Sequence, residues 1–169
     1  LTADHGEAFG EHKSYFEHGF LLYEETTRVP LLFKLPGVPP ARIDTRRSHI
    51  DLARTFVDLL GVPAPKEMRG ESLVPELYGA RPPQREIVID MPYTDQTPRR
   101  RAIIHDNHKL IVTETLEQPE LYDLEADPRE QRDLVREKPE LLAEMKKHYQ
   151  RLNDAAPDFP APRRSKRQY

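Results

Sequence analysis

The chain has 169 residues, enough for one domain with a buried core or for one and a half such domains. Its 26 basic and 29 acidic residues give a formal charge of -3, so net charge provides no general attraction to nucleic acid or to a membrane surface. The chain has no cysteine, which excludes a disulfide framework, a thiolate metal site and a cysteine nucleophile within these residues. No apolar run approaches the length that crosses a membrane.

Acidic and imidazole side chains gather near the beginning of the chain, which reads LTADHGEAFGEHKSYFEHG. Asp4 and His5 are adjacent and precede Gly6, and two further histidines, His12 and His18, follow. Neighbours in a strand point to opposite faces, so Asp4 and His5 can reach one ion only at a strand end, where Gly6 permits a sharp turn. Carboxylate and imidazole are suitable ligands for a divalent cation. Taken alone, such a pair is more often a cap or a surface turn.

The first half of the chain predicts one strand and one clear helix. Residues 28–34 contain the continuous apolar run VPLLF and predict a buried strand. Residues 48–61 predict a helix with a weak capping box from Ser48 to Asp51, and a short helical turn is expected at residues 74–78. The expected apolar face of the helix consists of Ile50, Ala53, Phe56, Val57 and Leu60.

The second half predicts strands followed by a helix. Strands are expected at residues 86–91, 101–104, 109–112 and 120–124, with a hairpin turn at residues 105–108. A helix should begin at Pro139, with Leu141, Leu142, Met145, Tyr149 and Leu152 on its buried face. We therefore expect an α/β region over residues 1–80, a small antiparallel subdomain with a helix over residues 81–154, and a flexible basic tail over residues 155–169.

Several motifs resemble the sulfatase family of the alkaline phosphatase superfamily. The segments DHGEAFGEH, HG, LYEE and RVPLLF carry this resemblance at the start of the chain. The segments SHIDLARTFVDLLGVPAP, RGESLVPEL, HKLIV and ELYDLEADPREQRDLV extend it to about residue 152. The resemblance implies the C-terminal part of an alkaline-phosphatase-like α/β fold: a remnant of the large sheet, and a small antiparallel sheet packed with a terminal helix.

The resemblance also implies roles for individual residues. Asp4 and His5 match metal ligands, and His18 matches a residue that contacts the sulfuryl or leaving oxygen, which makes it a catalytic candidate. His12 and Lys13 are candidates for substrate binding, although His12 could instead be a hydrogen-bond anchor and Lys13 a solvated lysine. For Glu24 we expect an exposed helical turn with weak local ion pairs. His49 and Asp51 are assigned to capping, and His105 and His108 are only weak candidates.

The expected cofactor is a divalent metal ion, calcium first, with manganese or zinc as alternatives because of His5. Sulfatases use a formylglycine made within a C/S-x-P-S-R motif, and no such motif occurs here. We therefore expect the nucleophile upstream of Leu1, and weak metal binding without turnover in these 169 residues alone. The implied substrate is an aryl or carbohydrate sulfate ester. The resemblance suggests a periplasmic, extracellular or membrane-anchored protein, while the sequence itself leaves the compartment open.

Two alternative functions stay open. A phosphoethanolamine transferase or a phosphodiester or phosphonate hydrolase of the same superfamily would share DHGE and a downstream HG. A non-catalytic polyanion-binding protein would use the basic residues of the tail, which are Arg163, Arg164, Lys166 and Arg167. Exposed strand edges also predict homo-oligomer formation.

Overall fold

The structure is a computed structural model that describes residues 1–12, 15–93 and 97–155. It separates into two compact units. The helical unit contains Leu1 and Leu31–Ile87, and the sheet unit contains Thr2–Pro30 and the chain from Val88 onward. This division differs from the predicted boundary at residue 80, because Thr2–Pro30 groups with the C-terminal sheet rather than with the helical region. The reason is a set of buried polar contacts between these two segments, described below.

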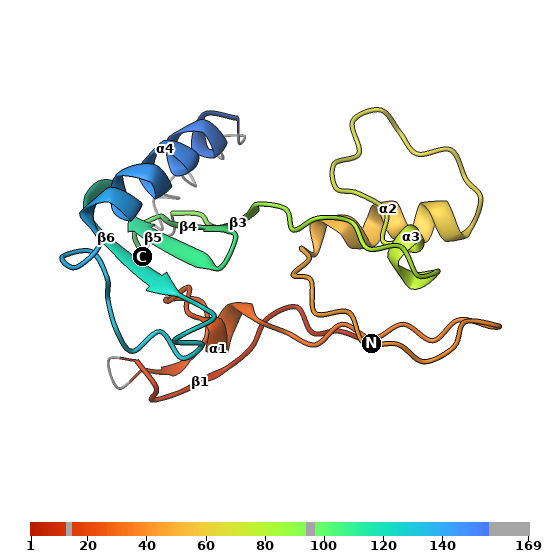
Figure 1. The fold of residues 1–169 in the computed structure, drawn as a ribbon, viewed down its shortest axis with the longest axis horizontal. Coiled ribbons are helices and arrows are strands. Elements are labelled where there is room, and N and C mark those ends of the chain that lie inside the picture. Colours follow the sequence, from red (N-terminus) through yellow and green to blue (C-terminus); the bar gives the residue numbers. More distant parts are fainter. Residues whose placement is uncertain (13–14, 94–96, 156–169) are drawn as a thin grey trace, which may run out of the picture. The chain divides into compact units, whose positions relative to one another are not determined.

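Four antiparallel strands form the sheet of the sheet unit, in the order β3, β4, β5, β6 (Figure 1). The strands are β3 Ile87–Met91, β4 Arg100–His105, β5 His108–Thr113 and β6 Thr115–Asp123. His105 pairs with His108, so a two-residue turn joins β4 to β5. Asp106 has a φ of 50° in this turn, a conformation that Asp tolerates better than most residues. The predicted hairpin and the α/β fold class with its small antiparallel sheet are confirmed.

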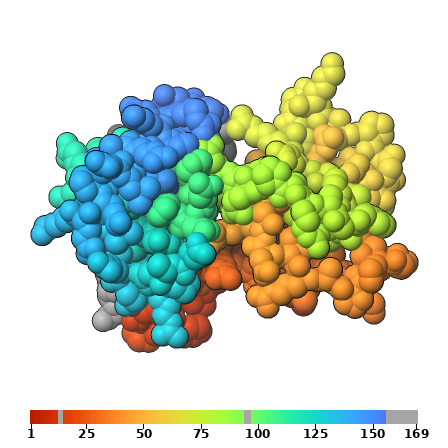
Figure 2. Space-filling model, viewed as in Figure 1, coloured from red at the N-terminus to blue at the C-terminus, as the bar shows by residue number. Residues whose placement is uncertain are grey.

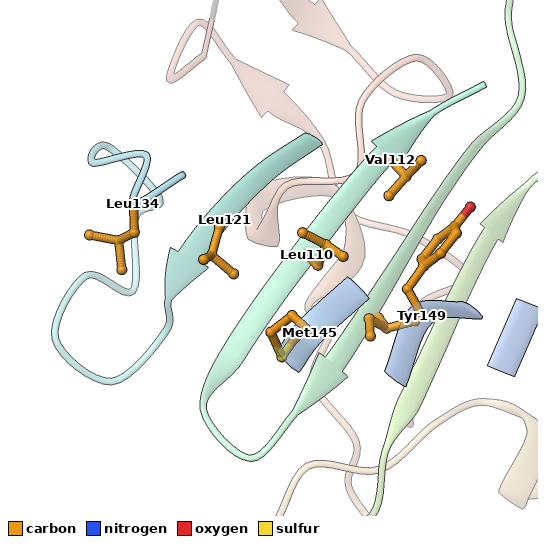
Figure 3. Close-up of a cluster of buried hydrophobic side chains, with 7 residues drawn as sticks. Leu110, Val112, Leu121, Leu134, Met145 and Tyr149 are labelled. Atoms are coloured by element: carbon orange, nitrogen blue, oxygen red, sulfur yellow. The ribbon is translucent and has the colours of Figure 1, made fainter. Parts of the chain in front are cut away.

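Helix α4, Pro139–Ala155, packs on this sheet with the apolar face that the sequence predicts. Met145 and Tyr149 join Leu110, Val112 and Leu121 in one buried cluster (Figure 3). In the space-filling view, the side chains of α4 lie directly against the neighbouring parts of the sheet unit (Figure 2). Burial of these apolar side chains is the main favourable contribution to the stability of the unit.

The N-terminal part of the sheet unit contains three short elements. Strands β1 Ala8–Phe9 and β2 Phe16–Glu17 form an antiparallel pair, and helix α1 Glu24–Thr27 follows. The predicted buried strand at residues 28–34 is wrong for this structure, where only an isolated bridge at Leu31 is found. A buried strand needs hydrogen-bonded neighbours, and within the described residues the backbone of Leu32 bonds only to Leu1, at 2.7 and 2.8 Å.

The helical unit contains α2 Ile50–Leu59 and α3 Val74–Leu77, close to the predicted positions. The buried face of α2 is not the predicted apolar one, since its buried residues are Asp51 and Thr55 while Phe56 is 53% exposed. Asp51 accepts backbone hydrogen bonds from Ser48 at 3.1 Å and Glu71 at 2.9 Å, and it pairs with Arg85 at 2.5 Å. The bond from the Ser48 amide is the half of the predicted capping box that Asp51 makes, whereas His49, the residue before α2, makes no side-chain cap hydrogen bond, so its predicted capping role is wrong. The three partners of Asp51 hold the polar face of α2 inward.

Within the described ranges, no helix has both the length and the apolar character needed to cross a bilayer. The predicted basic tail lies outside the described residues, apart from its first residue, Ala155, which ends α4. Self-association through strand edges stays a prediction.

We predict that an ion pair between strands makes the sheet unit sensitive to acid. Arg101 donates to both carboxylate oxygens of Asp90, at 2.8 and 3.1 Å. Burial alone raises the pKa of Asp90, but hydrogen bonds and charges from Arg101 and Arg99 outweigh it and lower this pKa below its ordinary 3.8. A lowered carboxyl pKa contributes stability above the ordinary value, and that contribution disappears as the pH falls through the folded pKa.

Asp90→Asn should therefore lower the free energy of unfolding at pH 7. The difference from the unsubstituted protein should shrink as the pH approaches 3, measured by urea unfolding at each pH. Asp154→Asn, which alters an exposed carboxylate near the end of α4, provides the control. A pH-independent difference would contradict the assignment of this ion pair.

Candidate active site

Asp4 and His5 lie in the exposed segment that leads to the β1–β2 hairpin. The Oδ2 atom of Asp4 is 3.6 Å from the Nε2 atom of His5. The Nδ1 atom of His5 is 2.8 Å from the carbonyl oxygen of Gly6 and donates to it, which leaves Nε2 as the nitrogen with an available lone pair. The two candidate ligand atoms therefore lie on neighbouring residues and within reach of one ion.

This pair fits the metal that the sequence predicts. Ligands at about 2.1 and 2.4 Å from one ion and 3.6 Å from each other subtend an angle of about 105°, within the range of common coordination geometries. Backbone hydrogen bonds, including one from the amide of His5, lower the pKa of Asp4, so its carboxylate is ionised near neutral pH. A single carboxylate and a single imidazole supply only part of a coordination shell.

The third candidate, His18, lies beside this pair. Its ring stacks on the ring of His5 with centroids 4.0 Å apart. Its Nδ1 atom is 3.1 Å from Oε2 of Glu7, and its backbone carbonyl accepts a hydrogen bond from the Tyr15 hydroxyl at 2.8 Å. The structure thus brings Asp4, His5 and His18 together, as the spacing of the motif suggested, and it adds Glu7 and Tyr15, which the sequence reasoning had not assigned.

Gly6 is required by a close contact with helix α1. Its amide donates to the carbonyl of Thr26 at 2.9 Å, and a Cβ atom at Gly6 would lie 2.1 Å from the carbonyl oxygen of Glu25. A side chain at this position would collide with backbone, which cannot move aside cheaply. The sequence predicted that Gly6 is needed for a sharp turn. In the structure, glycine is needed because the segment that carries Asp4 and His5 approaches α1 closely.

His12 is buried, and both of its ring nitrogens contact protein atoms. Nδ1 lies 2.7 Å from the Glu25 carboxylate and Nε2 lies 2.9 Å from the carbonyl of Glu130, while the ring stacks on Tyr23. This position matches the anchoring alternative, and substrate contact by His12 is left as a prediction. Lys13 lies outside the described residues.

Residues 10–155 match the family model described as "N-sulphoglucosamine sulphohydrolase, C-terminal". The chain belongs to the sulfatase family. A choline-sulfatase of Rhizobium meliloti is 33% identical over 140 residues, which cover 80% of this chain and 26% of that protein. The chain therefore spans about a quarter of the length of this relative.

Solved structures show the same fold. A structure of an enzyme in complex with its substrate D-glucosamine-2-N,6-O-disulfate matches 90% of this chain and 33% of its own, at 27% identity and a TM-score of 0.74. A phosphonate monoester hydrolase of Agrobacterium radiobacter matches 91% of this chain and 34% of its own, at 22% identity and a TM-score of 0.76. The second likeness shows the fold alone, so the fold does not separate the two chemistries.

A buried ionic cluster connects the N-terminal segment of this sulfatase chain to the sheet. Lys109 of β5 is completely buried, and its Nζ atom lies 3.1 Å from the carboxylate of Glu24 and 3.0 Å from that of Glu130. The other carboxylate oxygen of Glu130 accepts the amide hydrogen of Glu24 at 2.5 Å. Burial raises the pKa of Glu130, and the positive charge of Lys109 opposes that shift.

The cluster corrects the prediction for Glu24, which is a buried partner of Lys109 rather than an exposed residue with weak ion pairs. The sequence contained one usable signal: Lys109, a charged residue directly before the apolar residues LIV in the strand HKLIV. A lysine that points from a strand into the protein interior requires a buried acid. The adjacent glutamates Glu24 and Glu25 are the simplest source. Glu130 had no comparable signal, because its segment has neither strand nor helix periodicity.

Two tyrosines add a second connection between the same segments. The hydroxyls of Tyr23 and Tyr122 both donate to one oxygen of Glu120, at 2.5 and 2.7 Å. Burial first, and then the hydrogen bonds and charge of Glu120, raise the pKa of both tyrosines well above its usual value, so both stay protonated donors. The residue preceding α1 is thereby tied to β6.

Replacement of the buried lysine should be strongly destabilising. Lys109→Met keeps the length of the side chain but leaves Glu24 and Glu130 buried without a counter-ion, which should cost roughly 3–5 kcal/mol of unfolding free energy. Urea or thermal unfolding measures the loss, and Lys147→Met, on the exposed side of α4, is the matched control.

The triple variant Lys109→Met with Glu24→Gln and Glu130→Gln removes all three charges and should recover part of the lost stability. A loss below about 1 kcal/mol in the single variant would show that the cluster does not hold the N-terminal segment.

Proposed function

We propose that the protein to which this chain belongs hydrolyses sulfate esters of aryl alcohols or carbohydrates. The observation that carries the proposal is the convergence of Asp4, His5, Glu7 and His18 in a chain of the sulfatase family. Carboxylates and stacked imidazoles at one exposed site provide both ligands for a cation and a group that can transfer a proton. The comparison structure with glucosamine disulfate supports a carbohydrate sulfate, and the choline-sulfatase supports sulfate esters in general.

Asp4 and His5 are the proposed metal ligands in this chain. Calcium is the first expectation, and the nitrogen of His5 also suits manganese or zinc. A divalent cation held there would neutralise charge on the sulfuryl oxygens. Asp4 would contribute an ionised oxygen, and the hydrogen bond to Gly6 would keep the Nε2 lone pair of His5 directed away from the backbone.

His18 is the proposed proton donor to the departing oxygen. Glu7 accepts from its Nδ1 atom at 3.1 Å, which orients the ring. The other ring nitrogen can then deliver its proton to the alcohol oxygen as the sulfur–oxygen bond breaks. Tyr15 acts as a positioning residue, because its hydroxyl holds the backbone carbonyl of His18.

The nucleophile is proposed to come from outside these 169 residues. Attack at sulfur requires an activated oxygen nucleophile, and the chain contains no C/S-x-P-S-R motif in which a formylglycine could be made. The family resemblance suggests a formylglycine supplied by another part of the protein. The isolated chain should then bind metal weakly and show no turnover.

The main alternative is hydrolysis of phosphonate or phosphodiester substrates. The Agrobacterium enzyme shares the fold, and an imidazole with a metal site would serve either chemistry. Sequence identity is higher for the choline-sulfatase, and we therefore favour sulfate.

An assay of the whole protein on matched aryl esters tests the proposal. We expect 4-nitrophenyl sulfate to be hydrolysed with a kcat/KM at least about tenfold above that of 4-nitrophenyl phenylphosphonate, with Asp4→Asn and His5→Ala reducing both metal affinity and rate. Calorimetric titration with calcium provides the binding measurement, and Asp106→Asn, in the β4–β5 turn, is the control for lost surface charge. Preference for the phosphonate would replace the sulfatase proposal with the alternative.

His18→Gln tests the proton-donor role. Loss of a general acid should reduce kcat by about 10²–10⁴ for alkyl sulfates, whose leaving group needs the proton, and much less for 4-nitrophenyl sulfate. The slope of log kcat against leaving-group pKa should therefore become steeper. His108→Gln, in the β4–β5 hairpin, should leave the slope unchanged. An equal loss on all substrates would assign His18 to sulfuryl binding instead.

A further inference from the structure

The β1–β2 hairpin has two different faces. Ala8 pairs with Glu17 and Phe9 pairs with Phe16, so each pair occupies one face. Ala8 is 2% exposed, whereas Phe9 is 71% and Phe16 is 62% exposed. Two large aromatic side chains are thus presented side by side, on the face opposite to the one that Ala8 buries.

The register places the candidate proton donor on the same face as the aromatic pair. Glu7 immediately precedes β1 and His18 immediately follows β2, and their side chains meet at 3.1 Å. Glu7 is two residues from Phe9 along the chain, and Glu7 contacts His18, so we infer that the Glu7–His18 pair lies on the face of Phe9; the link from His18 to Phe16 passes through Glu17, whose φ is 153°. Two residues further along the strand correspond to about 7 Å.

The ring of Phe16 rests against the hairpin, and the backbone of Phe9 is held by a hydrogen bond. A Cβ atom at Gly10 would lie 2.8 Å from the Cζ atom of Phe16, so the ring of Phe16 rests on the backbone at this glycine. The amide of Phe9 donates to the carboxylate of Glu11 at 2.5 Å, and the amide of Gly10 donates to the carbonyl of Tyr15 at 2.8 Å. Exposed apolar side chains that are ordered and adjacent to a reactive site commonly bind a ligand.

We propose that Phe9 and Phe16 bind the ring of the alcohol part of the substrate. This inference rests on the proposed function, in which His18 faces the leaving oxygen. In aryl esters, and in sugar esters at a ring hydroxyl, that oxygen is attached directly to the ring, so the ring must lie within a few ångströms of His18 and on the same face. Aromatic faces contact phenyl rings and the C–H faces of sugars, which gives the pair a preference for ring-bearing sulfate esters over open-chain ones.

The experiment separates ring binding from turnover. In the whole protein, Phe9→Ala, Phe16→Ala and the double variant should raise KM for 4-nitrophenyl sulfate and for glucosamine 3-sulfate, whose ester oxygen is attached directly to the ring, about tenfold, with kcat little changed. The KM for methyl sulfate, which has no ring, should stay the same. Tyr78→Ala, which removes an exposed aromatic side chain of the helical unit, is the matched control.

A second measurement does not need a functioning site. Equilibrium titration with 4-nitrophenol should show about tenfold weaker binding in the double variant, equivalent to about 1.4 kcal/mol. If no ester is hydrolysed, the sulfatase proposal fails, and this titration still decides the role of the aromatic pair. The inference would be overturned if the double variant kept both the affinity for 4-nitrophenol and the ratio of the KM for 4-nitrophenyl sulfate to the KM for methyl sulfate.

Phe16→Leu distinguishes ligand binding from packing against another segment of the longer protein. Leucine keeps the apolar volume but removes the aromatic face, so ring binding should still weaken while the melting temperature is kept. The pair has a packing role, and the inference is wrong, if Phe16→Leu keeps full affinity for the ring. The same conclusion follows if the alanine variants have a lower melting temperature and lose activity equally on methyl sulfate and on ring esters.

Discussion

The buried ammonium of Lys109 is the constraint on which the candidate site depends. It lies on β5, inside the sheet unit, and it fixes Glu24 at the start of α1. Helix α1 in turn receives Gly6 so closely that no side chain fits between them, and Gly6 follows directly after Asp4 and His5. The position of the segment that carries Asp4 and His5 is therefore set by a charge on a strand that is more than a hundred residues away in sequence.

This cluster provides geometric specificity more than net stability. A buried ion pair loses hydration that its Coulomb attraction only roughly offsets, so apolar residues of the same volume could give equal stability. Apolar contacts, however, do not depend on direction. The ion pairs of Lys109 with Glu24 and Glu130 do, and they therefore favour one arrangement of α1. The backbone carbonyl of Glu130 also contacts His12, and its carboxylate accepts the amide hydrogen of Glu24. A single loop therefore holds the N-terminal segment at two places.

Sequence periodicity predicted the elements that pack by apolar burial and failed where polar groups direct the packing. The helix α4 and the β4–β5 hairpin follow directly from apolar spacing and from a turn-forming Asp-Asn pair. Helix α2 shows where prediction from periodicity fails. Its apolar spacing is regular, but Asp51 makes three polar contacts and faces inward. The proximity of Asp4, His5 and His18 could be anticipated from their motif, and their roles stay predictions. The contact of Glu7 with His18 depends on the register of the hairpin, and that of Lys109 with Glu24 on pairing between residues far apart in sequence.

His12 has a consequence for His18 that neither residue shows alone. The β1–β2 hairpin contains only two residue pairs, too few to fix its own register, and a shift by one residue would turn His18 to the opposite face. His12 lies in the connection between the strands, is buried against Glu25 and Glu130, and accepts the amide hydrogen of Tyr15 on its carbonyl at 2.9 Å. The hydroxyl of Tyr15 then reaches the carbonyl of His18. The buried histidine therefore fixes the face on which His18 lies, which explains why a loop so close to solvent contains an imidazole with both ring nitrogens in contact with protein atoms.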